Sequence, residues 1–185
     1  MRGLLKGDKV ILEALREEDL DVVNRWFNNV EFLRHYDMIP AVTQNKKEVS
    51  EMLEEFEKSN ERYIFGIRLK EDHRLIGILG YDDIVWASGS AFLFIGIGEY
   101  DFHGKGLAKE ALTLLLDFGF SELNLHKIQL NVLQYNERAI KLYEACGFVK
   151  EGTYREYIYR DSQRYDMYLY GILKTEWQQN ARKNS

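Results

Sequence analysis

The sequence predicts one α/β or α+β domain, a single sheet with helices inserted between its strands. Short apolar segments of strand length, bounded by glycine or charged turns, alternate along the chain with segments of helical period. The length of 185 residues fits one domain, and no linker-like or low-complexity stretch divides it. We expect this domain to span residues 1–177 and a polar tail to follow at residues 178–185.

Composition and charge exclude several classes of protein. Contents of 45% hydrophobic and 14% aromatic residues argue against disorder, and 30% charged residues argue against a membrane protein. A formal net charge of −5 disfavours general nucleic-acid binding. The single cysteine, Cys146, excludes an intramolecular disulfide, and the histidines show no ligand spacing, so no metal site is predicted. The apolar residues at the N-terminus are too few for a signal peptide, and we expect a cytoplasmic protein.

The first part of the chain predicts one strand followed by helices. Residues 10–15 form an apolar run of strand length, and the acidic start of residues 17–27 is typical of a helix N-terminus. Residues 28–42 contain the only proline and have no clear period, which predicts a loop or a broken helix. Asn45 is typical of a helix cap, and the apolar side chains that follow it share one helical face.

The middle of the chain predicts three strands and a buried helix. Residues 63–69 and 75–81 are apolar runs separated by a polar turn, which indicates a hairpin. Residues 92–98 are almost continuously apolar and end in glycines, so we expect a strand that is buried on both faces and lies beside the hairpin. Polar residues form only a narrow stripe along residues 107–120, which predicts a mostly buried helix.

The last part of the chain predicts a strand, a short helix and a closing hairpin. Residues 127–133 alternate between apolar and polar types with a period of two, as in a strand with one more polar face. Asn136 is a suitable N-cap and Gly147 a suitable residue just after a helix C-terminus, which places a helix of about ten residues between them. Residues 154–159 and 164–173 flank a polar turn and form the hairpin.

The glycine turn between the residue 92–98 strand and the buried helix is the first candidate site. Gly104 and Gly106 allow the backbone to approach a ligand closely, and the first N–H groups of a helix lack an intrahelical partner. Such a helix start binds anions, with Lys105 and Lys109 as supporting cations. The same glycines equally fit a tight strand-to-helix turn that binds nothing.

A tyrosine on the next predicted helix is the second candidate. Asn136 and Tyr143 are seven residues apart, so at about 100° per residue they point within about 20° of each other. If the preceding strand pairs beside residues 92–98, both side chains face the groove that begins at Gly104, where a tyrosine is suited to delivering a proton. The alternative is that Tyr143 packs with Ala139 in an ordinary amphipathic face.

Two motifs occur in a fixed order. Residues 104–111 read Gly-Lys-Gly-Leu-Ala-Lys-Glu-Ala, and residues 131–148 lead from Asn131 through the helix of Tyr143; residues 164–168 and 176–177 add smaller features. On these motifs the chain resembles the GNAT superfamily of N-acetyltransferases over nearly its whole length, in the RimJ/RimL-like branch that includes ribosomal-protein and spermidine acetyltransferases. The resemblance implies the GNAT fold, a single mixed, mostly antiparallel sheet that is splayed in the middle and flanked by helices.

The resemblance implies acetyl-CoA as cosubstrate and no metal. The backbone of the strand before the glycine turn would pair with the pantetheine arm, its glycines would keep the groove open, and Asn136 would hydrogen-bond the arm. Cofactor contacts are implied at Ile95, Gly96, Ile97, Gly98, His103, Gly104, Lys105, Gly106, Leu107, Ala108, Asn131, Asn136, Arg138 and Lys141. Asp101 departs from the family pattern, which usually has arginine or glutamine at this position. A carboxylate there would repel a diphosphate.

The implied mechanism is direct attack of a primary amine on the acetyl thioester. The amine must first lose a proton, because an ammonium group with a pKa near 10.4 is not a nucleophile. Glu99 is the candidate base, directly or through a water, and equally fits a surface carboxylate. Tyr143 is the candidate acid for the CoA thiolate. Cys146 as a nucleophile is the alternative, but the C-terminal end of a helix is the wrong end for lowering the pKa of a thiol.

The acceptor is a primary amine whose identity stays open. The resemblance implies a pocket between the first two helices, their loop and the C-terminal hairpin, with side chains suited to a cation at Tyr36, Asp37, Tyr154, Glu156 and Tyr157. Branch resemblance favours a peptide or protein α-amine. The alternatives are a polyamine or aminoglycoside-type small molecule, and a non-catalytic CoA-binding regulatory module. We expect no nucleic-acid or membrane partner, and a homodimer stays open.

Overall fold

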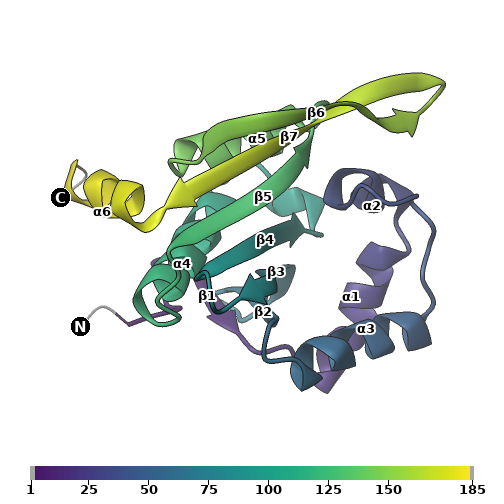
Figure 1. Ribbon diagram of the computed structural model, residues 1–185. Coiled ribbons are helices and arrows are strands. Elements are labelled where there is room, and N and C mark those ends of the chain that lie inside the picture. Colours follow the sequence, from purple (N-terminus) through teal and green to yellow (C-terminus); the bar gives the residue numbers. More distant parts are fainter. Residues whose placement is uncertain (1–2, 184–185) are drawn as a thin grey trace.

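The computed structural model describes residues 3–183, which contain one seven-stranded sheet flanked by helices (Figure 1). The strands follow the order β1-β2-β3-β4-β5-β7-β6 across the sheet. Their bounds are β1 Val10–Glu13, β2 Tyr63–Leu69, β3 Leu75–Val85, β4 Ser90–Ile97, β5 Lys127–Leu133, β6 Val149–Arg160 and β7 Gln163–Leu173. The predicted fold class, a single mixed sheet with inserted helices, is confirmed.

β4 and β5 form a parallel pair in an otherwise antiparallel described sheet, and they separate soon after they meet. Their register joins only residues 90–92 of β4 to residues 127–129 of β5. Beyond that point β4 remains paired with β3, and β5 remains paired with β7. The sheet therefore opens as a wedge between the two strands, which is the splay that the resemblance implied.

Six α-helices accompany the described sheet, and two of them flank the wedge. Their bounds are α1 Leu20–Phe27, α2 Val30–Tyr36, α3 Lys46–Lys58, α4 Leu107–Ser121, α5 Glu137–Ala145 and α6 Lys174–Lys183. Short 3-10 turns precede α1 at Glu17–Asp19 and follow β4 at Tyr100–Phe102. α4 follows β4 and α5 follows β5, so the N-terminal ends of both helices lie at the open end of the sheet.

The segment predicted as a loop or a broken helix contains α2 and then extended chain. The Asn29 side chain accepts hydrogen bonds from the backbone N–H groups of Glu31 and Phe32, which caps this short helix. Asn45 caps α3 in the same way, as the sequence predicted, and the structure adds Glu48, which completes a capping box. α6 continues to Lys183, so residues 178–183 of the predicted polar tail are helical, and residues 184–185 lie outside the described residues.

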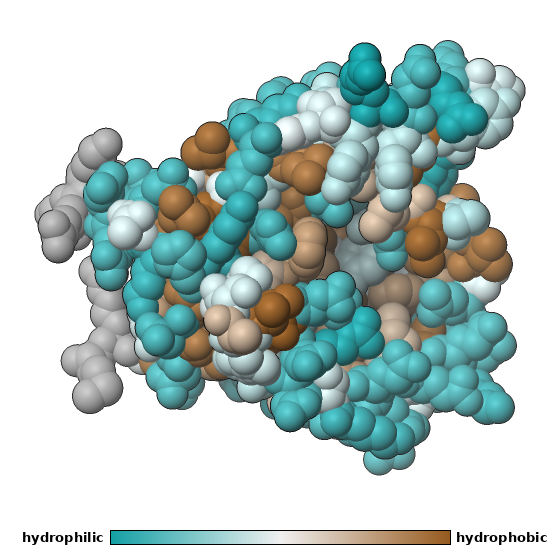
Figure 2. Space-filling view, in the orientation of Figure 1, coloured by the Kyte–Doolittle hydropathy of each residue, from teal (hydrophilic) through white to brown (hydrophobic). Residues whose placement is uncertain are grey.

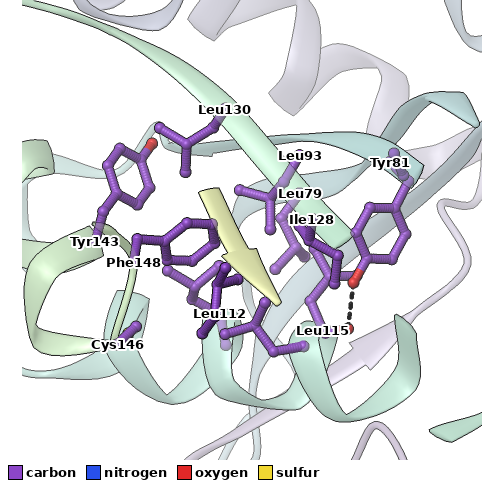
Figure 3. Packing of buried hydrophobic residues seen from close by; sticks show 14 of the residues in the cluster. Leu79, Tyr81, Leu93, Leu112, Leu115, Ile128, Leu130, Tyr143, Cys146 and Phe148 are labelled. Carbon is purple, nitrogen blue, oxygen red and sulfur yellow. Dashed lines mark hydrogen bonds between the residues drawn. The ribbon is translucent and has the colours of Figure 1, made fainter. Parts of the chain in front are cut away.

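Two buried clusters hold the helices against the sheet. One joins α1, α2 and α3 to β3, and the larger one joins α4 and α5 to most of the strands. Tyr81 on β3 is fully buried and donates a hydrogen bond to the carbonyl of Leu115 on α4, with an O···O distance of 2.6 Å (Figure 3). α4 is thus mostly buried, as predicted. Among the described residues, no helix is both long and apolar enough to cross a membrane.

Candidate active site

A cavity of about 970 Å³ lies where β4 and β5 separate. Figure 2 shows the molecule hollowed on this face, with pale side chains inside and both hydrophilic and hydrophobic residues around the rim. The structure brings most of the predicted site residues together along one part of it, namely Ile95, Gly96, Ile97, His103, Gly104, Gly106, Leu107, Ala108, Asn131, Asn136, Arg138, Lys141 and Tyr143. Gly98, Glu99 and Lys105 are not among its lining residues.

The glycine turn adopts a backbone conformation that favours glycine. Gly104 has a φ of 74° and Gly106 a φ of 79°, both in the left-handed region. A Cβ at either position would meet no heavy atom within 4 Å, so the requirement comes from the backbone and not from crowding. Gly106 is the N-cap of α4, and no side chain in the described structure caps this helix. Its first N–H groups therefore face the cavity as an anion site.

His103 links the turn to β4 and α5. Its Nε2 donates to the carbonyl oxygen of Ile97 at 3.0 Å, and its Nδ1 accepts from a guanidinium N–H of Arg138 at 2.7 Å. Burial lowers the pKa of His103, the contact with Ile97 opposes this, and the nearby Arg138 lowers it further. The imidazole is therefore neutral at pH 7, and it directs Arg138 toward the start of α4.

Lys105 lies on the outer side of the turn. Its ammonium sits over the Phe102 ring, 5.0 Å from the centroid. It lines a smaller cavity together with Lys9 and Lys70. The carboxylates of Asp8 and Glu71 line the same cavity, so these lysines are not an unopposed cationic patch, and Asp101 is exposed nearby.

Gly96 near the end of β4 and Gly98 just after it have a different purpose from the predicted one. A Cβ on Gly98 would collide with the Trp26 ring, and a Cβ on Gly96 would lie 2.8–2.9 Å from atoms of Tyr36 and Phe32. Aromatic side chains of α1 and α2 thus occupy the space over these glycines. The expectation that both glycines keep a groove open is corrected: they allow two helices to pack directly on β4.

Tyr143 is buried at the wall of the cavity. It is 7% exposed and packs against Phe148, with ring centroids 5.9 Å apart. Figure 3 shows it with Phe148 and Cys146 at one end of the larger buried cluster. Burial raises the pKa of Tyr143, and Cys146 adds to the rise, so the phenol stays protonated throughout the physiological range. The position combines both predicted alternatives, since this tyrosine is part of the core and also lines the cavity.

Asn136 uses its side chain within the protein. Its Oδ1 accepts from the backbone N–H of Ala139 at 3.3 Å, which caps α5. Its Nδ2 donates to the carbonyl oxygen of His35 at 3.1 Å. The residue thus ties the start of α5 to the end of α2, and its expected contact with a pantetheine arm would have to compete with these bonds.

Glu99 forms an ion-pair network away from the cavity. Its carboxylate accepts from Trp26 Nε1 at 3.0 Å, from Arg74 at 2.9 Å and from Arg25, and its side chain is 13% exposed. Burial alone would raise the pKa of Glu99, but hydrogen bonds from Trp26 and the arginines outweigh it and lower the pKa. A carboxylate held ionised by three donors is a poor general base. The geometry disfavours the catalytic role expected for Glu99 and indicates a positioning role.

Cys146 fits the alternative of a buried filler. It is 7% exposed at the C-cap of α5, and burial raises its pKa to about 11 against the opposing effects of Lys109 and Thr113. A thiol with this pKa is almost fully protonated at pH 7. The geometry therefore gives no support to a cysteine nucleophile.

The other part of the cavity carries carboxylates and aromatic rings. Glu31, Asp37, Asp82 and Asp83 line it, together with the rings of Phe27, Phe32, Tyr36, Phe56, Phe92 and Phe94. Arg62 binds Asp82 through two hydrogen bonds of 2.5 and 3.0 Å and so neutralises one of the carboxylates. The sequence predicted Tyr36 and Asp37 in this pocket but missed Asp82, because nothing in the local sequence indicates that β3 reaches the cavity.

Three predicted acceptor residues lie elsewhere. Tyr154 and Tyr157 are 46% and 53% exposed on β6, and neither lines the cavity. Glu156 lies between them with a φ of 51°, where a bulge shifts the register of β6 against β7. These three residues form an outer surface of the hairpin, and their expected place in the acceptor pocket is corrected.

The first part of the cavity suits an extended thioester ligand that carries phosphates. Residues 93–97 of β4 have no strand partner on the side of β5, which leaves an edge for main-chain pairing. The uncapped N-terminus of α4 suits a diphosphate, and Lys109 and Arg138 line the cavity with it. No group of three or more metal-ligating side chains is assembled within residues 3–183. A wedge in a sheet with this anion site is the architecture of an acyl-CoA-dependent transferase.

The chain belongs to the acetyltransferase (GNAT) family, whose domain model matches residues 9–149. A spermidine N(1)-acetyltransferase of Vibrio cholerae is 30% identical over 92% of this chain and 96% of its own length. A [ribosomal protein uS5]-alanine N-acetyltransferase of Escherichia coli is 31% identical over 68% of this chain and 65% of its own. The crystal structure of the Vibrio cholerae spermidine N-acetyltransferase with CoA and spermine superposes with a TM-score of 0.85, at 29% identity, over 93% of this chain and 99% of that one.

These findings confirm the predicted family and its branch of ribosomal-protein and spermidine acetyltransferases. The chain is therefore an N-acetyltransferase that uses acetyl-CoA and acts on an amine.

Proposed function

We propose that the acceptor is a small cationic amine of the polyamine class, acetylated at a primary amino group. The observation that carries this proposal is the set of carboxylates on the second part of the cavity, Glu31, Asp37, Asp82 and Asp83. Only Asp82 has a cation paired with it there, so the pocket keeps an excess of negative charge for a ligand with several ammonium groups. Similarity to a spermidine acetyltransferase over nearly the whole chain supports the same class.

A protein α-amine is the second candidate. Similarity to an acetyltransferase of the ribosomal protein uS5 favours it, although that similarity covers 68% of this chain. A peptide N-terminus carries one ammonium group, so it would use fewer of the carboxylates.

The proposed division of labour places acetyl-CoA along β4 and the α4 turn, and the amine among the carboxylates. The bound cofactor supplies an acetyl thioester. The N-terminal amides of α4 and the guanidinium of Arg138 hold its phosphates, and the open edge of β4 aligns its arm. Fixing both reactants in the wedge supplies roughly 7–11 kcal/mol of the barrier, more than any proton transfer.

Tyr143 is the proposed hydrogen-bond donor to the departing sulfur. Its raised pKa keeps the proton on the phenol oxygen, which is the form needed to donate. A free thiol has a pKa near 8.5, so this tyrosine is a weaker acid than the thiol that it would protonate. We infer that Tyr143 stabilises the developing thiolate and does not transfer its proton completely before the sulfur leaves.

Release of free CoA thiol from acetyl-CoA tests the acceptor proposal. The purified chain is assayed with spermidine, with a peptide that begins with alanine, and with an aminoglycoside. We expect the highest kcat/KM for spermidine, and mass spectrometry identifies the acetylated product. A higher kcat/KM for the peptide would favour the second candidate, and turnover of no amine despite stabilisation by acetyl-CoA would leave only a CoA-binding module.

A further inference from the structure

The C-terminal end of α2 forms part of the acceptor wall and depends on distant residues for its hydrogen bonds. A helix leaves its last carbonyl groups without intrahelical partners. In α2 only the Leu33 carbonyl is satisfied locally, by the Asp37 N–H at 3.1 Å. The chain that follows, Met38, Ile39 and Pro40, lines the cavity and is exposed on its outer side.

Arg160, the last residue of β6, donates to this segment with both ends of its guanidinium. One Nη contacts the carbonyl of Arg34, and the other donates to the carbonyls of Asp37 at 3.0 Å and Ile39 at 2.9 Å. The first Nη also contacts the hydroxyl of Tyr135, which itself donates to the Arg34 carbonyl at 2.6 Å. The hydrogen-bond acceptors of Arg160 are thus neutral oxygen atoms, three of them backbone carbonyls.

A second contact joins α2 to the β6–β7 hairpin. Arg34 of α2 forms an ion pair with Asp161, whose φ of 51° places it in the two-residue turn after β6. Figure 1 shows the β6–β7 hairpin reaching beyond the rest of the sheet toward α2. The hairpin tip is therefore fastened to the end of α2 by two arginines that point in opposite directions.

We propose that Arg160 is a positioning residue for the acceptor, acting through the backbone of residues 34–39. Neither Arg160 nor Tyr135 lines the cavity, so neither side chain touches the ligand. A cation at a helix C-terminus interacts favourably with the helix dipole, and the forked guanidinium can hold several carbonyls that a single ammonium cannot. Without it these carbonyls turn to water, and the wall that carries Asp37 and Tyr36 loses its fixed geometry.

This inference rests on the proposed assignment of the carboxylate-lined part of the cavity to the amine. It adds a determinant of acceptor binding that lies on the C-terminal hairpin, outside the cavity, whereas the sequence predicted that the hairpin contributes Tyr154 and Tyr157 directly.

The test compares Arg160→Met with Arg164→Met at saturating acetyl-CoA and varied spermidine. Arg164 is exposed on the same hairpin and contacts the Glu156 carbonyl and the Tyr159 ring, both on β6, so it is the matched control. We expect Arg160→Met to raise the KM for spermidine about 10- to 100-fold, the scale of losing charged hydrogen bonds, with the KM for acetyl-CoA within about twofold. Arg160→Lys should restore part of the loss, and Arg164→Met should match wild type.

Hydrogen–deuterium exchange provides a readout that needs no substrate. Arg160→Met and the milder Tyr135→Phe should each increase deuterium uptake in residues 34–40, and Arg164→Met should not.

Unchanged uptake in Arg160→Met overturns the proposal, and so does increased uptake with an unchanged acceptor KM. If wild type prefers another amine to spermidine, the polyamine assignment fails, and the KM comparison is made with that amine. If Arg160→Met does not fold, Tyr135→Phe decides by the same two measurements.

Discussion

At the scale of single residues, the burial of Tyr143 determines what its hydroxyl contributes. The phenol is 7% exposed and burial raises its pKa, so it carries its proton between pH 6 and 9. The hydroxyl is therefore a hydrogen-bond donor that does not switch off between pH 6 and 9. Any pH dependence of its contribution must come from the leaving thiolate.

Tyr143→Phe should lower kcat while leaving acetyl-CoA affinity and stability near wild type. The substitution keeps the ring that packs against Phe148 and removes only the hydroxyl. A positioned acid typically contributes a factor of about 10²–10⁴ in rate, and incomplete proton transfer from Tyr143 to the leaving sulfur predicts the lower part of this range. Because a thiolate needs less help above about pH 8.5, the ratio of wild-type to variant kcat should decrease as the pH rises. An equal kcat from pH 6 to 9 would show that Tyr143 only fills the core.

Glu99 was the candidate general base, but its contacts indicate a structural role. It joins the end of β4 to Trp26 on α1 and to Arg74, which directly precedes β3. The Trp26 ring in turn occupies the space over Gly98. These partners are 25 to 73 positions away in the sequence, so no local pattern shows that this carboxylate is already engaged.

Glu99→Gln should reduce stability without removing activity. Replacing the carboxylate leaves Trp26 and the arginines with a weaker acceptor, at a cost of about 1–3 kcal/mol. Since the folded-state pKa of Glu99 is lowered, its stabilisation is fully present above the unfolded pKa of about 4.3 and is lost as the pH falls through the folded value. Urea unfolding should therefore show the largest difference between variant and wild type near pH 7 and a smaller one below about pH 4. Loss of kcat in a folded Glu99→Gln protein would restore Glu99 as the base.

At the scale of elements, the local patterns predicted most strands and helices, and the errors occurred where an element depends on distant contacts. α2 has only seven residues, and its C-terminal carbonyls are satisfied by Tyr135, Asn136 and Arg160 from the other end of the chain. A short helix of this kind has little stability of its own, so its residues show no clear period. Tyr154 and Tyr157 were misplaced for a related reason, because the bulge in β6 changes which face each residue occupies.

The turn before α4 can be tested as a unit through its backbone. Gly106→Val forces a β-branched residue into a left-handed conformation with a φ of 79°, which costs about 1–2 kcal/mol or displaces the turn. We expect the variant to fold and to lose the thermal shift produced by acetyl-CoA. Gly152→Ala is a suitable control, because its added Cβ would meet only Leu169, at 3.9 Å. A thermal shift in Gly106→Val equal to that of wild type would mean that the amides of α4 do not bind the diphosphate.

At the scale of the whole molecule, the site exists because two halves of the sheet are joined by only a short parallel register. β1 to β4 form one antiparallel unit with α1, α2 and α3, and β5 to β7 form another with the C-terminal hairpin. The family resemblance carried by two ordered motifs on either side of the wedge implied this splayed sheet. It did not predict the contacts of Arg34 and Arg160 between α2 and the hairpin, which join the two halves on the acceptor side, because contacts across more than 100 positions leave no pattern in sequence.

Acetyl-CoA should therefore stabilise the molecule as a whole and protect the wedge in particular. A ligand that binds only the folded state adds RT ln(1 + [L]/Kd), or about 2.7 kcal/mol at 100 times Kd. For a domain of this size each kcal/mol raises Tm by roughly 2–4 °C, so we expect an increase of about 5–11 °C. Because the arm would pair with the open edge of β4, hydrogen exchange should slow most in residues 93–97, with less change in β1, which is remote from the wedge. A comparable rise in Tm without protection of residues 93–97 would place the cofactor outside the wedge and contradict its proposed binding along β4.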